Sequence, residues 1–124
     1  MDDEIRRALA SERTVDITTT GRKTGQPRRV EIWFHAIEDT IYITGSPGKR
    51  DWYANLLAQP DLTFHLKKSV MADLPARAVP ITDETERRVL LDEVTSRVGA
   101  SERIDDWVAR SPLVRVEFEV SPIS

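Results

Sequence analysis

The sequence predicts a mainly β protein of the α+β type, in which six antiparallel strands close into a small barrel with short helices at its periphery. Residues 30–36 alternate apolar and polar side chains with a period of two, as a half-buried strand does. Glycine and proline clusters divide the chain into short segments, and strand-like segments outnumber helix-like ones. A closed barrel removes the exposed strand edges that such a sheet would otherwise leave, so closure is expected.

The elements are expected to follow one another within a single domain over residues 1–124. The segments are an N-terminal helix at 1–13, five strands within 14–81, a short helix at 51–58, helices within 82–110 and a last strand at 112–120. Asp51 is expected to cap the short helix, and Thr82 or Asp83 the long one. Val89, Leu90 and Val94 should form the buried stripe of the long helix.

One strand contains prolines and is therefore expected at a sheet edge. Residues 71–81 hold Pro75 and Pro80 among alternating small and apolar residues. Proline cannot donate a ladder hydrogen bond, and within sheets it is found mainly on edge strands.

Composition excludes several classes of function. The 124 residues contain no cysteine, which removes disulfides, thiol nucleophiles and thiolate metal sites. His35 and His65 are the only histidines and lie thirty residues apart, so no metal site is expected. No apolar run is long enough to span a membrane and no secretory signal is evident, so a cytoplasmic protein without integral membrane association is expected.

The charge distribution favours a small anionic ligand over nucleic acid. The net charge is −3, yet residues 21–50 hold six basic and three acidic side chains. A short basic segment within an acidic protein does not provide the broad positive face of a nucleic-acid-binding protein. It suits a local anionic ligand better.

Two loops combine glycines with cations. The first, residues 18–29 (TTTGRKTGQPRR), offers exposed amides and guanidinium groups to a phosphate or carboxylate, although a solvated basic hairpin loop is the alternative. The second, residues 45–55 (GSPGKRDWYAN), leads into a helix N-terminus, which attracts anions. Here the alternative is a capped helix whose aromatic residues pack in the core.

A few isolated residues could carry chemistry. Trp33 lies on the polar side of its strand, where it would line a substrate pocket or cover the end of the barrel. His35 and His65 are interpreted as surface strand residues rather than general acids, and Trp107 as a packing residue. Ser46 has no evident base at readable spacing, so hydrolysis by a serine nucleophile has no support.

Taken together, the two loops resemble those of the deazaflavin-dependent nitroreductase family. The motif T-T-G-R-K-T-G-x-P-R precedes D-W-Y-x-N-L-x-x-x-P in the same order, and the resemblance covers roughly residues 14–68. The family is the branch of the split β-barrel flavin-binding superfamily that uses coenzyme F-420. The resemblance therefore implies a six-stranded antiparallel split β-barrel.

The resemblance also implies an activity and a set of site residues. The protein would transfer a hydride between F-420 and a small organic substrate, as nitroreductases and quinone reductases do. Ser46 would hydrogen-bond a substrate oxygen, and Trp33 would face the substrate. The residues implied in cofactor binding are Arg22, Lys23, Thr24, Arg28, Thr44, Gly45, Ser46, Gly48, Trp52 and Asn55.

Two alternatives remain open at this point. The chain could be an FMN-binding split-barrel oxidoreductase, or a non-catalytic split barrel that carries a lipid or another small ligand. The physiological substrate is not determined by these motifs, and both a monomer and a homodimer are compatible with them.

Overall fold

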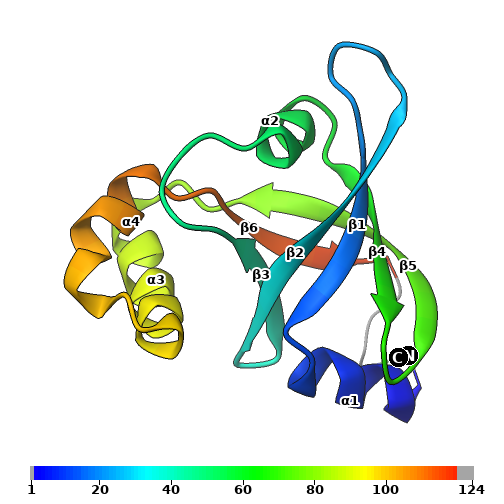
Figure 1. The fold of residues 1–124 in the computed structure, drawn as a ribbon, viewed down its shortest axis with the longest axis horizontal. Helices are drawn as coiled ribbons and strands as arrows, with labels where there is room; N and C mark the ends of the chain where they lie inside the picture. Colours follow the sequence, from blue (N-terminus) through cyan, green and yellow to red (C-terminus); the bar gives the residue numbers. More distant parts are fainter. Residues whose placement is uncertain (1, 120–124) are drawn as a thin grey trace.

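A computed structural model describes residues 2–119 and contains one closed antiparallel barrel, with the strand order β1-β2-β3-β6-β5-β4 (Figure 1). The strands are β1 (Thr14–Thr20), β2 (Pro27–Ile37), β3 (Thr40–Thr44), β4 (Asp61–Lys67), β5 (Met71–Pro80) and β6 (Leu113–Phe118). The prediction of a six-stranded closed barrel is confirmed. The last predicted strand also included Val120, which lies outside the described residues.

Four α-helices surround the barrel. They are α1 (Asp3–Ser11), α2 (Asp51–Ala58), α3 (Glu84–Val98) and α4 (Ile104–Arg110), and a 3-10 turn (Ser101–Arg103) precedes α4. In Figure 1, α2 lies beside the β1–β2 loop at one end of the barrel, α1 lies at the other end, and α3 and α4 stand together on one side. None of these helices is both long and apolar enough to cross a bilayer.

The barrel interior is built from alternating side chains. In β1, Val15 and Ile17 are fully buried while the residues between them are only partly covered. Phe64 packs edge-to-face against Phe34 and against Phe118, with ring centroids 5.3 Å apart in each pair. A second apolar cluster lies outside the barrel, where α3 and α4 cover β3 and the start of β6.

The expectation that strand 71–81 lies at a sheet edge is wrong. Strand β5 pairs with β4 along Met71 to Arg77 and with β6 along Ala76 to Pro80. Its two prolines occupy tolerant positions. The carbonyl oxygen of Pro75 accepts a hydrogen bond from the Glu119 N–H (3.1 Å), and Pro80 is the last residue of the strand. Proline is therefore accommodated without an open edge.

The helix caps agree with the sequence prediction for α3 but not for α2. Asp83 caps α3 by accepting a hydrogen bond from the Glu86 N–H (2.9 Å), and Gly99 ends it at a φ of 75°, as expected. Asp51 does not cap α2, because it is the first helical residue and Arg50 holds the cap position. Val89 is also misplaced by the sequence prediction. Val89 is 68% exposed, and Leu91 is buried on the inner face of α3 instead.

Arg87 holds the two-helix unit onto the barrel. Its buried guanidinium donates to the carbonyl oxygens of Val108 (2.9 Å), Ile81 (2.9 Å) and Ser111 (2.7 Å), and more distantly to that of Trp107 (3.4 Å). Three of these carbonyls belong to the C-terminal end of α4, which favours a cation; that of Trp107 also accepts from the Ser111 N–H (2.9 Å). The charge run at residues 84–88 is typical of a solvated helix face, and from the sequence alone we expect all of it to be solvated; at Arg87 that expectation is wrong.

We expect Arg87→Met to lower the free energy of unfolding by about 3–5 kcal/mol, because it leaves several buried carbonyl oxygens without a donor. Urea denaturation monitored by circular dichroism measures this loss. The matched control is Arg88→Met, since Arg88 forms an exposed ion pair with Asp105 (3.0 Å) and should contribute at most about 1 kcal/mol. Equal effects of the two substitutions would contradict the assigned role.

Candidate functional site

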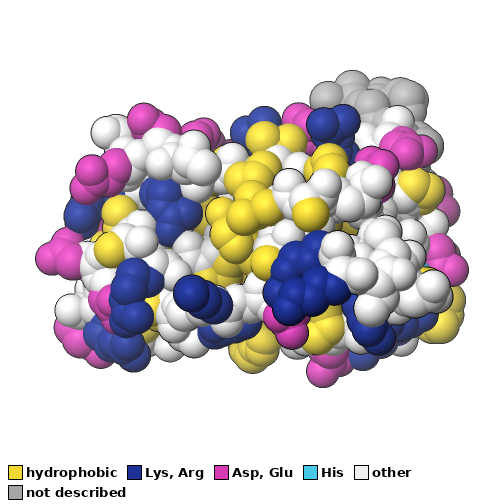
Figure 2. Space-filling view, turned by 90° about the horizontal axis from the view of Figure 1, so that it is seen from above, with side chains coloured by type: hydrophobic (Ala, Val, Ile, Leu, Met, Phe, Trp, Pro, Cys, Tyr) yellow, Lys and Arg dark blue, Asp and Glu magenta, His cyan; other side chains and the backbone are white. Residues whose placement is uncertain are grey.

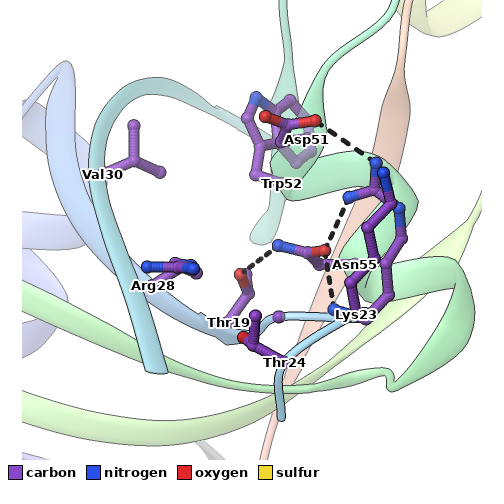
Figure 3. Close-up of a pocket in the computed structure, with 10 residues that line it drawn as sticks. Thr19, Lys23, Thr24, Arg28, Val30, Asp51, Trp52 and Asn55 are labelled. Carbon is purple, nitrogen blue, oxygen red and sulfur yellow. Dashed lines mark hydrogen bonds and ion pairs between the residues drawn. The ribbon is translucent and has the colours of Figure 1, made fainter. Parts of the chain in front are cut away.

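The first cavity lies between the β1–β2 loop and α2 (Figure 3) and has a volume of about 490 Å³. Figure 3 shows Arg28 and Val30 of β2 on one side and the side chains of α2 on the other. Most of the residues predicted to bind a cofactor line this space. The lining comprises Thr19, Gly21, Arg22, Lys23, Thr24, Arg28, Val30, Asp51, Trp52 and Asn55.

Backbone bonds fix the shape of the β1–β2 loop. The Gly21 N–H donates to the Gln26 carbonyl, and the Gly25 N–H to the Gly21 carbonyl, each at 2.8 Å. The hydroxyl of Thr24 accepts from the Gln26 N–H (3.2 Å). A Cβ at Gly21 would stand 2.8 Å from the Thr24 hydroxyl oxygen, and Gly25 has a φ of 71°, so glycine is required at both positions.

Asn55 joins this loop to α2 and to β1. Its side-chain oxygen accepts from the Arg22 backbone N–H (3.1 Å) and from Arg22 Nη1 (2.9 Å), while its amide nitrogen donates to the Thr19 hydroxyl (3.3 Å). Asn55 is only 4% exposed. It therefore connects the loop, β1 and α2 (Figure 3). It also lines the cavity.

The cations of the loop divide into two kinds. Arg22 is engaged with Asn55 and, at 3.4 Å, with the carboxylate of Asp51. Within residues 2–119, no carboxylate forms an ion pair with Lys23 or Arg28. Unpaired cations beside a flat indole, Trp52, fit an anionic group attached to a planar ring.

A second cavity of about 550 Å³ lies on the other side of Trp52, which lines both spaces. This cavity brings residues of the second loop (45–55) together with Trp33, the aromatic residue predicted to face the substrate. Its lining comprises Arg13, Ile32, Trp33, His35, Thr44, Gly45, Ser46, Arg50, Trp52, Arg97, Val98 and Trp107. Trp33 is 51% exposed here.

Figure 2 looks onto the face of the molecule that carries α2 and the β1–β2 loop. Lys and Arg side chains stand around an apolar centre on this face, and Asp and Glu side chains lie mainly toward the outline. The face is therefore locally positive although the net charge of the chain is −3.

Arg50 orders the segment that enters the second cavity. Its Nη2 donates to the Ser46 carbonyl (3.0 Å) and to the Ser46 hydroxyl oxygen (3.2 Å). The Ser46 hydroxyl thus accepts from Arg50 and keeps its own hydrogen for another acceptor. Thr44 is buried and donates to the Pro112 carbonyl (2.6 Å), so its role in this segment is structural.

His35 is buried at the second cavity, contrary to its interpretation as a surface residue. Burial lowers the pKa of His35 below its ordinary 6.5, and the guanidinium of Arg97 lowers it further. The imidazole is therefore neutral at neutral pH. Trp107 is buried against α3, as predicted, and also forms part of the cavity wall.

Gly48 is not brought to either cavity, although the resemblance implied a role in cofactor binding. It lines a third cavity with Lys49, Tyr53 and Arg110. Its N–H donates to the Arg110 carbonyl (3.2 Å), and its φ of 134° favours glycine. The geometry therefore gives Gly48 a role in tying the 45–50 loop to the end of α4.

His65 is buried, so its interpretation as a surface residue is wrong, and it belongs to a network that the sequence did not predict. Its Nδ1 lies 2.7 Å from the Asp73 carboxylate, and its Nε2 lies 2.7 Å from the Thr18 hydroxyl. Asp73 stands directly opposite His65 in the β4–β5 register, so the spacing of that hairpin was the available signal. None of the three residues lines either of the two cavities that meet at Trp52.

A sequence model of the family described as F-420H(2)-dependent quinone reductase matches residues 3–119. Among solved structures, the chain is similar to a conserved hypothetical protein from Mycobacterium tuberculosis, with a TM-score of 0.76, 20% identity, and coverage of 97% of this chain and 82% of that one. It is also similar to an F-420-H2-dependent reductase, with a TM-score of 0.63, 23% identity, and coverage of 86% and 95%.

A third similar structure is described as an F-420 reductase, with a TM-score of 0.61, 17% identity and coverage of 93% of both chains. At these identities the structural likeness shows the shared barrel fold. The family assignment comes from the sequence model, which spans nearly the whole described chain and confirms the resemblance seen in the two loops.

We expect the stability of the wild-type protein to decrease below pH 6.5 through His35. The unfolded chain takes up a proton at the ordinary pKa of 6.5, whereas the folded imidazole does so only at lower pH. The contribution is complete above pH 6.5 and is lost as the pH falls toward the lowered pKa. Urea midpoints across this range, compared with those of His35→Gln, measure it.

The carboxyl groups of Asp16 and Asp106, whose pKa values lie below 3.8, titrate at more acidic pH and are common to both proteins. Parallel stability curves for wild type and His35→Gln between neutral pH and pH 5 (about one and a half units below the ordinary histidine value) would contradict the expectation.

Proposed function

Because the chain belongs to the F-420H(2)-dependent quinone reductase family, we propose that it is an oxidoreductase that transfers a hydride between F-420 and a small organic acceptor such as a quinone. The observation that carries the proposal is the pair of cavities that meet at Trp52, one of which holds two unpaired cations. A cofactor with a planar ring and an anionic tail requires this combination of an aromatic wall and a basic groove.

In this proposal Lys23 and Arg28 bind the phosphate and acidic tail, because their charges have no carboxylate partner within residues 2–119. Arg22 contributes its charge and, through Asn55, holds the loop in place. Gly21 leaves room for the Thr24 hydroxyl, and both residues thereby keep the loop in the shape that would present its amides and cations to the anion. Trp52 and Gly45 then border the planar ring at the junction of the two cavities.

Reduced F-420, when bound, supplies the hydride and its electron pair. The protein's contribution is then to orient the acceptor, exclude water and stabilise the charge that the acceptor gains. In this proposal Trp33 stacks on the acceptor ring, and the Ser46 hydroxyl donates a hydrogen bond to an acceptor oxygen; both residues line the second cavity. Arg50 supports that donor by occupying a lone pair of the Ser46 oxygen.

We expect the double substitution Lys23→Gln and Arg28→Gln to weaken F-420 binding by about 2–4 kcal/mol, since each charge-assisted contact contributes about 1.5–3 kcal/mol before compensation. Titration of the purified protein with oxidised F-420, followed by the fluorescence of the coenzyme, measures the loss. The matched control is Lys68→Gln with Arg77→Gln, which removes two exposed charges away from both cavities.

Unchanged affinity in the cavity variant would rule out the assigned anion site. FMN titrated in parallel distinguishes the proposed F-420-dependent function from its alternatives. Saturable binding of FMN alone would assign the protein to FMN-dependent chemistry. Binding of neither compound by the wild type would favour a non-catalytic carrier of a lipid or another small ligand.

We expect Ser46→Ala to lower kcat about 10- to 100-fold for quinone reduction, because a donor aimed at developing negative charge acts mainly in the transition state. Steady-state assays with reduced F-420 and menadione measure this effect, and F-420 affinity should stay within about two-fold of wild type. Ser46→Thr retains a hydroxyl and should recover much of the rate. An equally slow threonine variant with intact stability would argue against hydrogen bonding by this side chain.

A further inference from the structure

The second cavity is surrounded by more positive charge than a neutral acceptor requires. Arg13 comes from the link between α1 and β1, Arg50 from the start of α2, and Arg97 from the last turn of α3. Within residues 2–119, no Asp or Glu lines this cavity. Three segments far apart in the sequence therefore deliver guanidinium groups to one cavity.

These charges are only partly neutralised. Among the three, within the described part of the chain, only Arg97 forms an ion pair, with the exposed carboxylate of Glu93 (3.1 Å). The bonds of Arg50 go to neutral oxygens of Ser46 and Lys49. By contrast, the first cavity contains a carboxylate of its own, that of Asp51.

Several hydrogen-bonding groups around the second cavity are donors only. Guanidinium groups cannot accept a hydrogen bond, and an indole N–H can only donate, although the N–H of Trp107 is itself buried. Trp33, Trp52 and Trp107 are all the tryptophans of the chain, and all three line this cavity. The direction of the pKa shift of His35 agrees, because Arg97 opposes protonation of the imidazole.

The walls suit a planar body. Trp33 is 51% exposed and Val98 41% exposed, although both are apolar and both border the cavity. Burying an indole face against a ring is favourable, and guanidinium groups at the margin can pair with a charged substituent. The cavity therefore combines an aromatic wall with three guanidinium groups, of which only that of Arg97 is paired with a carboxylate within the described residues.

We propose that the second cavity selects planar substrates that carry an anionic group, such as a carboxylate, and that Arg13 and Arg97 determine this specificity. The inference rests on the oxidoreductase function proposed above, in which this cavity receives the acceptor. It extends that function by naming the charge of the substrate.

The test compares two probes of the same shape, 2-naphthoate and its neutral amide, 2-naphthamide. Binding is followed by the chemical shifts of the three indole N–H groups in isotope-labelled protein, with and without saturating oxidised F-420. Trp33 and Trp107 line the second cavity and not the first, whereas Trp52 lines both, so the signals of Trp33 and Trp107 report where the probe binds. This readout does not depend on turnover.

At neutral pH the carboxylate should bind at least about ten-fold more tightly than the amide. Arg13→Gln and Arg97→Gln should each reduce this ratio about three-fold or more, and the double variant should bring it near unity. Arg77→Gln removes one exposed charge outside the cavity and should leave the ratio unchanged. The affinity of the double variant for F-420 should remain within about two-fold of wild type.

A ratio near unity in the wild type, or an unchanged ratio in the double variant, would overturn the inference. A large loss of F-420 affinity in the double variant would also overturn it, because the arginines would then serve the cofactor. The wild type could fail to bind F-420 and still bind 2-naphthoate more tightly than 2-naphthamide in a way that depends on the two arginines. In that case the proposed redox function fails while the preference for anions stands.

Discussion

The hydrogen bonds of Asn55 are the contact on which the arrangement of both cavities depends. A buried amide without partners costs about 1–3 kcal/mol, so α2 is held where Arg22 and Thr19 can satisfy it. Trp52 lies one helical turn earlier in α2 and is therefore placed by the same contact. The indole becomes the wall shared by the two cavities. The side chain of Asn55 thus links the conformation of the β1–β2 loop to the shape of the second cavity.

The basic side chains separate into those that serve the fold and those that face a cavity. Arg87 donates to several backbone carbonyls, and Lys67 forms ion pairs with Asp16 (2.6 Å) and Glu31 on the outside of the barrel. Their hydrogen-bonding capacity is used within the protein. Lys23 and Arg28 have no such carboxylate partners in the described residues, although placing like charges near one another costs energy. An anionic ligand of the kind proposed above would offset that cost.

The sequence was sufficient for the local features and insufficient for the long-range ones. Alternation and turn residues predicted the strands. The cations of the first loop motif line one cavity, and their binding role stays a prediction. Strand β5 was wrongly predicted at a sheet edge because prolines in sheets are found mainly on edge strands. Closure of the barrel depends on the pairing of all the strands and cannot be read from one segment. Arg87 was taken for a surface residue because its acceptors lie up to 24 positions away along the chain. Arg13 and Arg97 carry no motif, so their meeting at one cavity required the folded structure.

The cations of the second cavity have a further consequence for a reduction carried out there. An acceptor that receives a hydride gains negative charge, and an acceptor that already carries a carboxylate gains it against its own repulsion. A guanidinium about 4 Å away stabilises a unit negative charge by about 4 kcal/mol at the effective dielectric of a protein surface, and by less where water intervenes. The same arginines would therefore oppose the electrostatic penalty of reducing an anion as well as attract it. In the proposed reaction, substrate selection and transition-state stabilisation would then come from one set of side chains, in a cavity that no Asp or Glu of residues 2–119 lines.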